Sequence, residues 1–150
     1  MSIEQNKEMQ KRVFDAINTH DSSHLRDVLQ ELVAEEYTGH APGTPDYHGP
    51  DGFYEAVMGY YEALDNLNIQ IWHQVAEGEW VVARYEFGGT HQGELAGVAP
   101  TGRELLMQAI SMMHVRHGKI IEEFEFWDNM DVLQQLGVEV EPEADKTVDD

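Results

Sequence analysis

The residues best placed for chemistry lie between Lys119 and Asp128, in the stretch Lys-Ile-Ile-Glu-Glu-Phe-Glu-Phe-Trp-Asp. Its Ile, Phe and Trp residues predict a β-strand. Because strand side chains alternate between faces, Glu123 and Glu125 share one face with Trp127 and lie roughly 6–7 Å apart from Cα to Cα. Two carboxyl groups in a partly apolar space favour one protonated and one ionised form, as acid/base chemistry requires. The alternative is two glutamates on the solvated face of an acidic protein.

The strand expected before this one, Glu104 to Arg116, would supply the facing wall. His117-Gly118 suits a two-residue hairpin turn. That turn places four residues on the face of the two glutamates, and a turn one residue longer would move them to the other face. The expected pairs are Gln108 with Trp127, Ile110 with Glu125, Met112 with Glu123 and His114 with Ile121.

Histidines are the next candidates, because imidazole can transfer protons or donate a hydrogen bond to an enolate oxygen. His40, His91 and His114 are the ones considered, and each could instead be structural. His114 with Glu123 or Glu125 could also bind a metal. None of the eight histidines shows ligand spacing such as His-Glu-x-x-His, so we expect no metal site.

Arg84 lies in the middle of a predicted strand, where an inward guanidinium needs a partner such as Glu86 or Glu125. It could also bind an anionic substrate, although a structural salt bridge is the expected role. Large apolar side chains elsewhere either line a pocket for a flat apolar ligand or belong to the core. They are Trp72, Trp80, Tyr60, Tyr61 and the methionines.

Composition limits the partners of this chain. The 9 basic and 29 acidic residues give a formal charge of −20, which argues against nucleic acid and anionic membranes as partners. Such an excess of acid is typical of proteins from a high-salt cytoplasm, and the alternative is an ordinary acidic protein. There is no cysteine, hence no disulfide and no thiol nucleophile. The polar start and the absence of a long apolar run predict a cytoplasmic protein.

The order of elements predicts an α+β fold in one domain, residues 1–137, followed by a mobile acidic tail, 138–150. Helical periodicity indicates helices over 3–19, 23–33, 50–65 and 129–136. Alternation indicates strands over 68–76 and 80–91 before the hairpin described above. Phe124 and Phe126 lie on the face opposite the glutamates and also need cover. A second copy of the chain, forming a homodimer, is expected to provide it.

Several motifs resemble the SnoaL-like polyketide cyclases over roughly residues 5 to 137. The run Gly88 to Arg103 carries the resemblance, as do Gly118 to Asp128 and the closing Leu133 to Gly137. The stretch from Asn18 to Pro42, with Tyr37 and His40, fits as well.

This resemblance implies a cone-shaped fold of the nuclear-transport-factor-2-like kind, often dimeric, in which helices close over a curved antiparallel sheet. It implies ring closure by intramolecular aldol condensation without metal or organic cofactor. In that family an acid in the last long strand, usually within His-Trp-Asp, serves as acid/base. The matching positions are Glu123, Phe124 and Glu125, so the resemblance assigns the base to Glu125, one methylene longer than the usual aspartate.

Three functions remain open from the sequence. The first is a cofactor-independent lyase, isomerase or aldol-type cyclase acting on a small apolar carbonyl compound. The second is a non-catalytic module of the same fold that binds an apolar ligand or a protein partner. The third is an epoxide-hydrolase-like enzyme in which a carboxylate pair and Arg84 position a water molecule. An inward Arg84 beside Glu125 would favour the third, and a cone without a cavity would favour the second.

Overall fold

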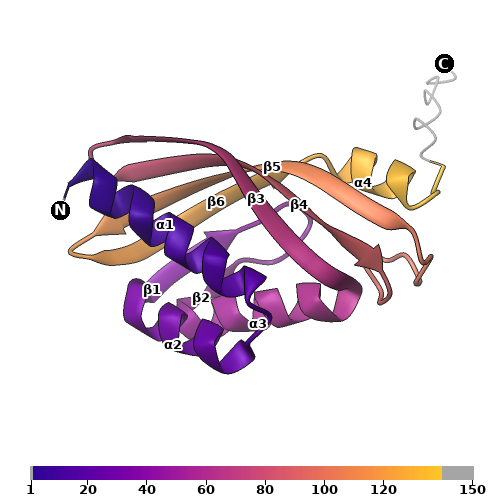
Figure 1. Cartoon of the computed structure of the whole chain (residues 1–150), viewed down its shortest axis with the longest axis horizontal. Coiled ribbons are helices and arrows are strands. Elements are labelled where there is room, and N and C mark those ends of the chain that lie inside the picture. Colours follow the sequence, from indigo (N-terminus) through magenta and orange to yellow (C-terminus); the bar gives the residue numbers. More distant parts are fainter. Residues whose placement is uncertain (1, 140–150) are drawn as a thin grey trace, which may run out of the picture.

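The protein is described here by a computed structural model covering residues 2–139. It is an α+β fold in which three helices lie against one face of a curved, unclosed sheet (Figure 1). The predicted tail lies almost entirely outside the described residues. In chain order the elements are α1 (Ile3–Asn18), α2 (Ser22–Leu32), β1 (Val33–His40), β2 (Tyr47–His48), α3 (Gly49–Ala63), β3 (Leu64–Glu77), β4 (Trp80–His91), β5 (Glu104–Arg116), β6 (Lys119–Trp127) and α4 (Asn129–Gln135).

The sheet has six strands in the order β2-β1-β6-β5-β4-β3. All neighbours are antiparallel except β1 and β6, which run parallel. The long central strands β4, β5 and β6 are consecutive, so short connections suffice to place them side by side. Both candidate glutamates lie on β6, in the interior of the sheet: Glu123 is paired with strands on both sides, and Glu125 is paired with Ser111 of β5.

Local sequence signals explain where the helices begin. Ser2 and Gln5 form a reciprocal capping box at the start of α1, and Asp21 accepts the backbone N–H of His24 at the start of α2. Asp128 caps α4 in the same way. These caps satisfy N–H groups that no earlier turn of the helix can reach.

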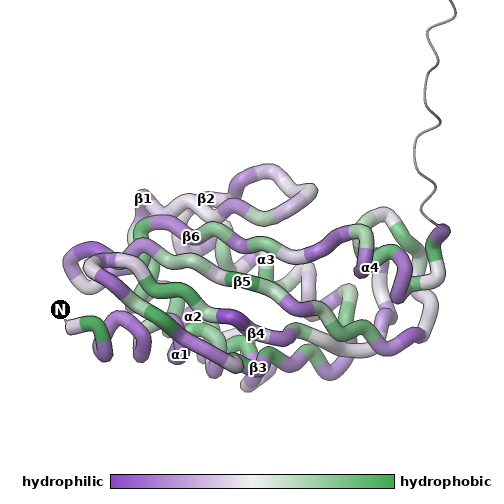
Figure 2. Tube along the Cα trace, turned by 90° about the horizontal axis from the view of Figure 1, so that it is seen from above, coloured by the Kyte–Doolittle hydropathy of each residue, from purple (hydrophilic) through white to green (hydrophobic). Residues whose placement is uncertain are grey.

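The helices pack on the sheet through apolar stripes at helical spacing. Val13 and Phe14 of α1 and Leu25 and Leu29 of α2 are all buried, as the sequence pattern predicts. Figure 2 looks onto the opposite face of the sheet, which α1, α2 and α3 leave uncovered. Within the described residues no helix has the length and apolar character needed to cross a membrane.

One local irregularity changes the register of the β5–β6 hairpin. His117 and Gly118 form the predicted two-residue turn, both with positive φ (51° and 74°). The pairing then slips by one residue between His114 and Val115, because β6 contains a β-bulge at Ile121. Ser111 therefore lies opposite Glu125, where Ile110 was predicted.

Candidate active site

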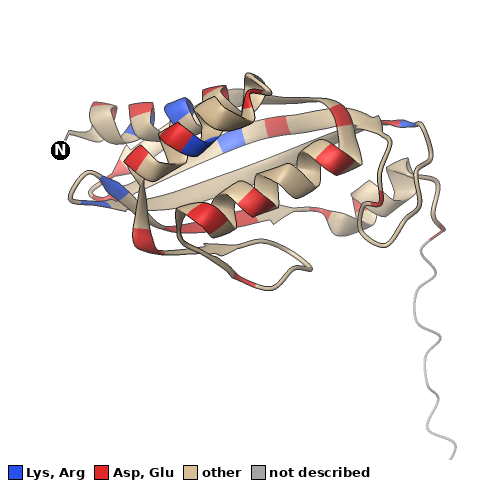
Figure 3. Cartoon of the chain, turned by 90° about the horizontal axis from the view of Figure 1, so that it is seen from below, with Lys and Arg blue, Asp and Glu red and all other residues tan. Residues whose placement is uncertain are grey.

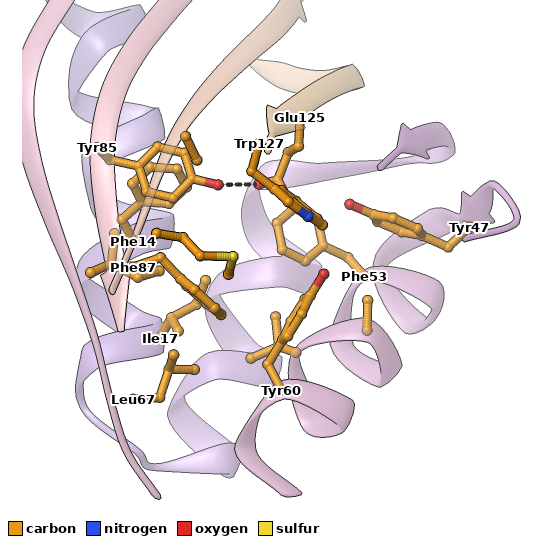
Figure 4. A pocket seen from close by; sticks show the side chains of 15 residues that line it. Phe14, Ile17, Tyr47, Phe53, Tyr60, Leu67, Tyr85, Phe87, Glu125 and Trp127 are labelled. Carbon is orange, nitrogen blue, oxygen red and sulfur yellow. Dashed lines mark hydrogen bonds between the residues drawn. The ribbon is translucent and has the colours of Figure 1, made fainter. Parts of the chain in front are cut away.

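A small cavity lies between the helices and the concave face of the sheet, with Glu125 in its wall (Figure 4). Its volume is about 40 Å³. One water molecule needs about 10–15 Å³ by the same measure, so the cavity holds a few waters at most. The lining is otherwise almost wholly apolar and includes Phe14, Ile17, Phe53, Val57, Leu67, Ile69, Phe87, Met107, Ala109 and Trp127.

Glu125 presents its carboxyl group to this cavity. Its Oε1 atom accepts a hydrogen bond from the Tyr85 hydroxyl at 3.2 Å, drawn as the dashed line in Figure 4. Burial, and next the negative charge of Glu123, raise the pKa of Glu125 well above its ordinary value. A carboxylate destabilised in this way is a stronger base than one in water.

Glu123 lies deeper and is fully buried. Oε1 accepts from the Tyr37 hydroxyl at 3.1 Å, and Oε2 accepts from the Ser111 hydroxyl at 2.6 Å. Burial raises the pKa of Glu123, while these two hydrogen bonds oppose the rise because they stabilise the ionised form. The two carboxyl groups of the pair therefore have different environments.

Two further tyrosines complete the polar part of the cavity. Figure 4 shows the hydroxyl groups of Tyr47 and Tyr60 on the same side of the cavity as Glu125. Burial and the charges of Glu123 and Glu125 raise the pKa of both phenols. Both are therefore neutral near pH 7 and can act as hydrogen-bond donors.

The cavity borders a larger and more open groove of about 730 Å³. Tyr47, Ala56 and Tyr60 line both spaces, so the two tyrosines separate them. The groove continues between the β1–β2 loop, α3 and the loop at Glu94 to Ala96. A ligand larger than the inner cavity could occupy this groove and present only one end to Glu125.

Gly39 makes this arrangement of tyrosines possible. A Cβ atom at position 39 would lie 2.2 Å from a ring carbon of Tyr47 and 2.7 Å from the hydroxyl of Tyr37. Real Cβ atoms do not approach other atoms so closely, so only glycine leaves room for both rings here. The sequence reasoning did not identify Gly39.

Four residues of β5 that were expected to line the pocket lie on the opposite face of the sheet. Because of the bulge at Ile121, Gln108, Ile110, Met112 and His114 all point to the outer face of the sheet. Ile110 pairs with Phe126 and Met112 with Phe124, and neither lines the cavity. His114 stacks on Trp80 at 4.2 Å between ring centroids, and its Nε2 atom lies 3.2 Å from Glu79.

Arg84 and Trp72 are also absent from the cavity wall. Arg84 is exposed and donates a hydrogen bond to the Gln108 side chain at 2.8 Å. Trp72 keeps 51% of its surface exposed. The expected pairing of Arg84 with Glu86 or Glu125 is therefore wrong. Arg84 does not lie inward beside Glu125, the arrangement that would have favoured a hydrolytic site.

His40 and His91 occupy structural positions outside the cavity. His40 lies between two carboxylates, with Nδ1 2.9 Å from Asp46 and Nε2 2.9 Å from Glu122. His91 is fully buried and its Nδ1 atom bonds to Thr101. Within residues 2–139 no group of three or more metal-ligating side chains forms a metal site.

Of the predicted residues the structure therefore brings together Glu123, Glu125, Trp127 and Tyr60. It adds four that sequence reasoning missed: Tyr37, Tyr47, Tyr85 and Ser111. Tyr85 and Ser111 lie on the apolar inner faces of strands β4 and β5, where every second residue is buried. The signal was therefore present for these two, but it required the correct register.

Comparison with known proteins identifies the family. The sequence profile of the SnoaL-like polyketide cyclases matches residues 7–136. The aklanonic acid methyl ester cyclase DauD of Streptomyces sp. (strain C5) is 28% identical over 130 residues, covering 85% of this chain and 78% of DauD. The nogalonic acid methyl ester cyclase of Streptomyces nogalater is 29% identical over 114 residues, covering 74% of this chain and 84% of the cyclase.

Structural comparison agrees. The crystal structure of a SnoaL-like protein from Jannaschia sp. CCS1 superposes with a TM-score of 0.82 at 22% identity, covering 93% of this chain and 97% of that one. The fold is thus the nuclear-transport-factor-2-like cone that the sequence motifs indicated. With the profile matching almost the whole described chain, the protein belongs to the SnoaL-like polyketide cyclase family.

Proposed function

We propose that this protein is a cofactor-independent acid/base enzyme that closes a ring in an apolar carbonyl compound by intramolecular aldol addition, with Glu125 as the general base. The observation that carries the proposal is the position of Glu125: its carboxyl group is in the wall of a small, mainly apolar cavity and has a raised pKa. Its position on the last long strand of a SnoaL-like fold supports the same role.

The reaction needs only one proton, which moves from carbon to oxygen. Ionised Glu125 removes a proton from the carbon next to a carbonyl group, giving an enolate. The enolate carbon attacks a second carbonyl of the same molecule, so that one C–C bond forms. Protonated Glu125 then returns its proton to the resulting alkoxide. No electron is gained or lost, and the starting state of the enzyme is restored.

Tyr60 is the residue that we assign to the enolate oxygen. Among the hydrogen bonds of the described chain its hydroxyl has no protein partner of normal geometry, and it faces the cavity (Figure 4). A neutral donor placed at a developing negative charge lowers the barrier to its formation. The surrounding aromatic side chains exclude water and so strengthen this interaction.

The two volumes constrain how a substrate binds. A cavity of about 40 Å³ cannot hold a multi-ring substrate. The reacting end therefore enters between Tyr47 and Tyr60, and the remainder occupies the outer groove. Two relatives are named as cyclases of aklanonic and nogalonic acid methyl esters. Binding of substrates this large requires the rings of Tyr47 and Tyr60 to move apart.

The test is turnover with these two esters and with smaller diketones, followed by mass spectrometry and absorbance. Glu125→Gln keeps the shape of the side chain and removes the base, so it should reduce kcat by at least about 10²-fold with an unchanged fold. Glu123→Gln removes the neighbouring charge and lowers the pKa of Glu125. It should shift the acid limb of the rate profile to lower pH without ending activity.

Glu86→Gln serves as the matched control, because Glu86 pairs with Gln108 on the outer face of the sheet. It should leave turnover unchanged. Full activity in Glu125→Gln would defeat the proposal. Tight binding of these compounds without any turnover would instead indicate a non-catalytic binding module.

A further inference from the structure

A chain of hydrogen-bonded side chains runs from the partly buried edge of the sheet to Glu123. It begins at Gln74 on β3 and passes through Gln10 on α1 and Ser111 on β5. Gln10 and Ser111 are almost completely buried. Neither touches the cavity, and the proposed reaction gives them no role.

Backbone carbonyl acceptors determine the direction of the hydrogen bonds from Gln74 to Ser111. The backbone carbonyl of Lys7 can only accept, so the Gln74 amide directs its NH₂ group there and to the Oε1 atom of Gln10 (3.1 and 2.9 Å). The NH₂ group of Gln10 then faces both the carbonyl oxygen and the hydroxyl oxygen of Ser111, each at 3.3 Å. The first of these acceptors excludes the opposite amide orientation.

The hydrogen bond between Ser111 and Glu123 indicates the protonation state of Glu123. Because the Ser111 hydroxyl oxygen already accepts from Gln10, its single proton is free to be donated to Oε2 of Glu123 at 2.6 Å. Tyr37 donates to Oε1. An ionised carboxylate is an acceptor on both oxygens, so these two donors match it. A proton on Oε2 would leave the Ser111 hydroxyl proton without its acceptor.

We infer that Gln74, Gln10 and Ser111 form a directional relay of donors that holds the negative charge of the carboxyl pair on Glu123 and leaves the proton on Glu125 in the resting protein. Glu125 has one hydroxyl donor, Tyr85, at a longer distance of 3.2 Å. The negative charge of one buried carboxyl group disfavours ionisation of its neighbour, so the two do not both ionise readily. Glu123, which accepts hydrogen bonds from two hydroxyl groups, therefore keeps the charge.

Within the described residues, no other charged group favours moving the negative charge from Glu123 to Glu125. The titratable groups facing the pair are Tyr37 on β1, Tyr47 on β2, Tyr60 on α3 and Tyr85 on β4. No cation in the described part of the chain contributes to the pKa of either carboxyl group. Gln10, Ser111 and Gln74 are thus positioning residues that act through Glu123.

The test measures the two carboxyl groups directly, by NMR titration of the full chain carrying ¹³C-labelled glutamate side chains. Glu123→Gln and Glu125→Gln assign the two resonances. In the unaltered protein Glu123 should be ionised through neutral pH and Glu125 should titrate at the higher pH. Ser111→Ala should lower the midpoint of Glu125 by about 1–2 pH units and raise that of Glu123, because a hydrogen bond to a charged group is lost.

Gln10→Leu provides a second variant and should shift both midpoints in the same directions by less. Asn6→Leu is the matched control: it removes another buried amide of α1, one that bonds only to the Gly78 carbonyl. It should leave both midpoints in place. A protonated Glu123 at neutral pH, or midpoints that move in neither Ser111→Ala nor Gln10→Leu, would overturn the inference.

The importance of this relay for catalysis rests on the proposed function, but the titration does not. It needs no substrate, so an absence of turnover would defeat the proposed reaction and leave the proton assignment tested. Only the fraction of the protein in which Glu125 has lost its proton can start the proposed reaction, so the acid limb of kcat/KM reports the Glu125 midpoint. If turnover is found, this limb should move to lower pH in Ser111→Ala together with that midpoint. A purely structural role for Ser111 would change the melting temperature and leave that limb in place.

Discussion

The surroundings of the Glu125 carboxyl group determine its protonation state. Glu125 is the position to which the resemblance assigns the acid/base, and its Oε1 atom accepts a hydrogen bond from the Tyr85 hydroxyl. Glu123, two residues earlier on the same strand, places a negative charge close to this carboxyl group. Its burial and the charge of Glu123 favour a proton on Glu125, because both disfavour the ionised form.

The proposed role of Tyr60 leads to a prediction about kcat. Tyr60→Phe removes the hydroxyl and keeps the edge-to-face contacts of the ring with Phe87 and Trp127. Loss of one donor to a developing oxyanion should lower kcat by about 10²–10³-fold, with a smaller change in KM. Steady-state kinetics on the substrate found by the turnover screen would measure it.

Tyr54→Phe is the control, because Tyr54 lies on the same helix and packs its ring under the Arg26 guanidinium. It should leave kcat unchanged. Equal losses in the two variants would assign the effect to α3 as a whole and contradict the role of the Tyr60 hydroxyl.

At the scale of elements, β6 connects the site to the rest of the fold. Its inward residues carry the carboxyl pair, and its outward residues Glu122 and Phe124 hold the loop between β1 and β2. His40 at the end of β1 stacks on Phe124 at 4.5 Å and bridges Glu122 and Asp46. The loop so held contains Thr44 and Pro45, which line the outer groove.

This bridge predicts a pH dependence of stability. The hydrogen bond to Glu122 is the largest cause that raises the pKa of His40 above 6.5. A group whose pKa is higher in the folded state stabilises fully below its unfolded pKa, and this contribution is lost as pH rises through the folded pKa. His40→Gln should therefore lower the melting temperature more at pH 6 than at pH 9.

His24→Gln is the matched control for that measurement, since His24 lies exposed in the first turn of α2. Thermal melts of both variants across the pH range would show whether the pH-dependent loss is specific to His40→Gln. An equal loss for His40→Gln at both pH values would show that packing on Phe124, and not the charged bridge, carries the contribution.

At the scale of the whole molecule, charge and exposed apolar surface dominate. The formal charge is −20, and Figure 3 shows acidic residues along the outer surfaces of the helices with few basic ones among them. Repulsion among these charges opposes the compact state and is screened by salt. The outer sheet face carries exposed apolar side chains, including Phe126, which is 60% exposed, and Leu106, which is 55% exposed.

The charge predicts that salt stabilises the fold. The Debye length falls from about 10 Å at 0.1 M to about 3 Å at 1 M, so the melting temperature should rise as KCl is increased over this range. Calorimetry at several KCl and NaCl concentrations would measure the rise, which should be similar for the two salts. A melting temperature that stays constant from low to molar salt would contradict it.

The exposed sheet face predicts a homodimer with two-fold symmetry. Phe126 pairs with Ile110 at the centre of this face, and apolar surface of this kind is normally covered in solution. Phe126→Asp should convert a dimer into a folded monomer, as light scattering in high salt would show. Ile3→Asp, on the helical side of the molecule, should not. A monomeric unaltered chain in high salt would contradict the prediction.

The sequence by itself determined the family, the fold class and the position of nearly every element. Caps at Ser2, Asp21 and Asp128 and the change from helical to alternating periodicity after α3 are local signals, so they can be read without a structure. Alternation also put Glu123, Glu125 and Trp127 on one face, because it depends only on neighbours along the chain.

Tertiary structure alone decided what those glutamates face. The bulge at Ile121 shifts the β5–β6 pairing by one residue, and since side chains alternate with a period of two, this exchanges the whole facing wall: Ser111 replaces Ile110 beside Glu125. Tyr37, Tyr60 and Tyr85 come from three elements far apart in the chain. Their convergence depends on how the sheet curves and where the helices pack, which no local pattern specifies.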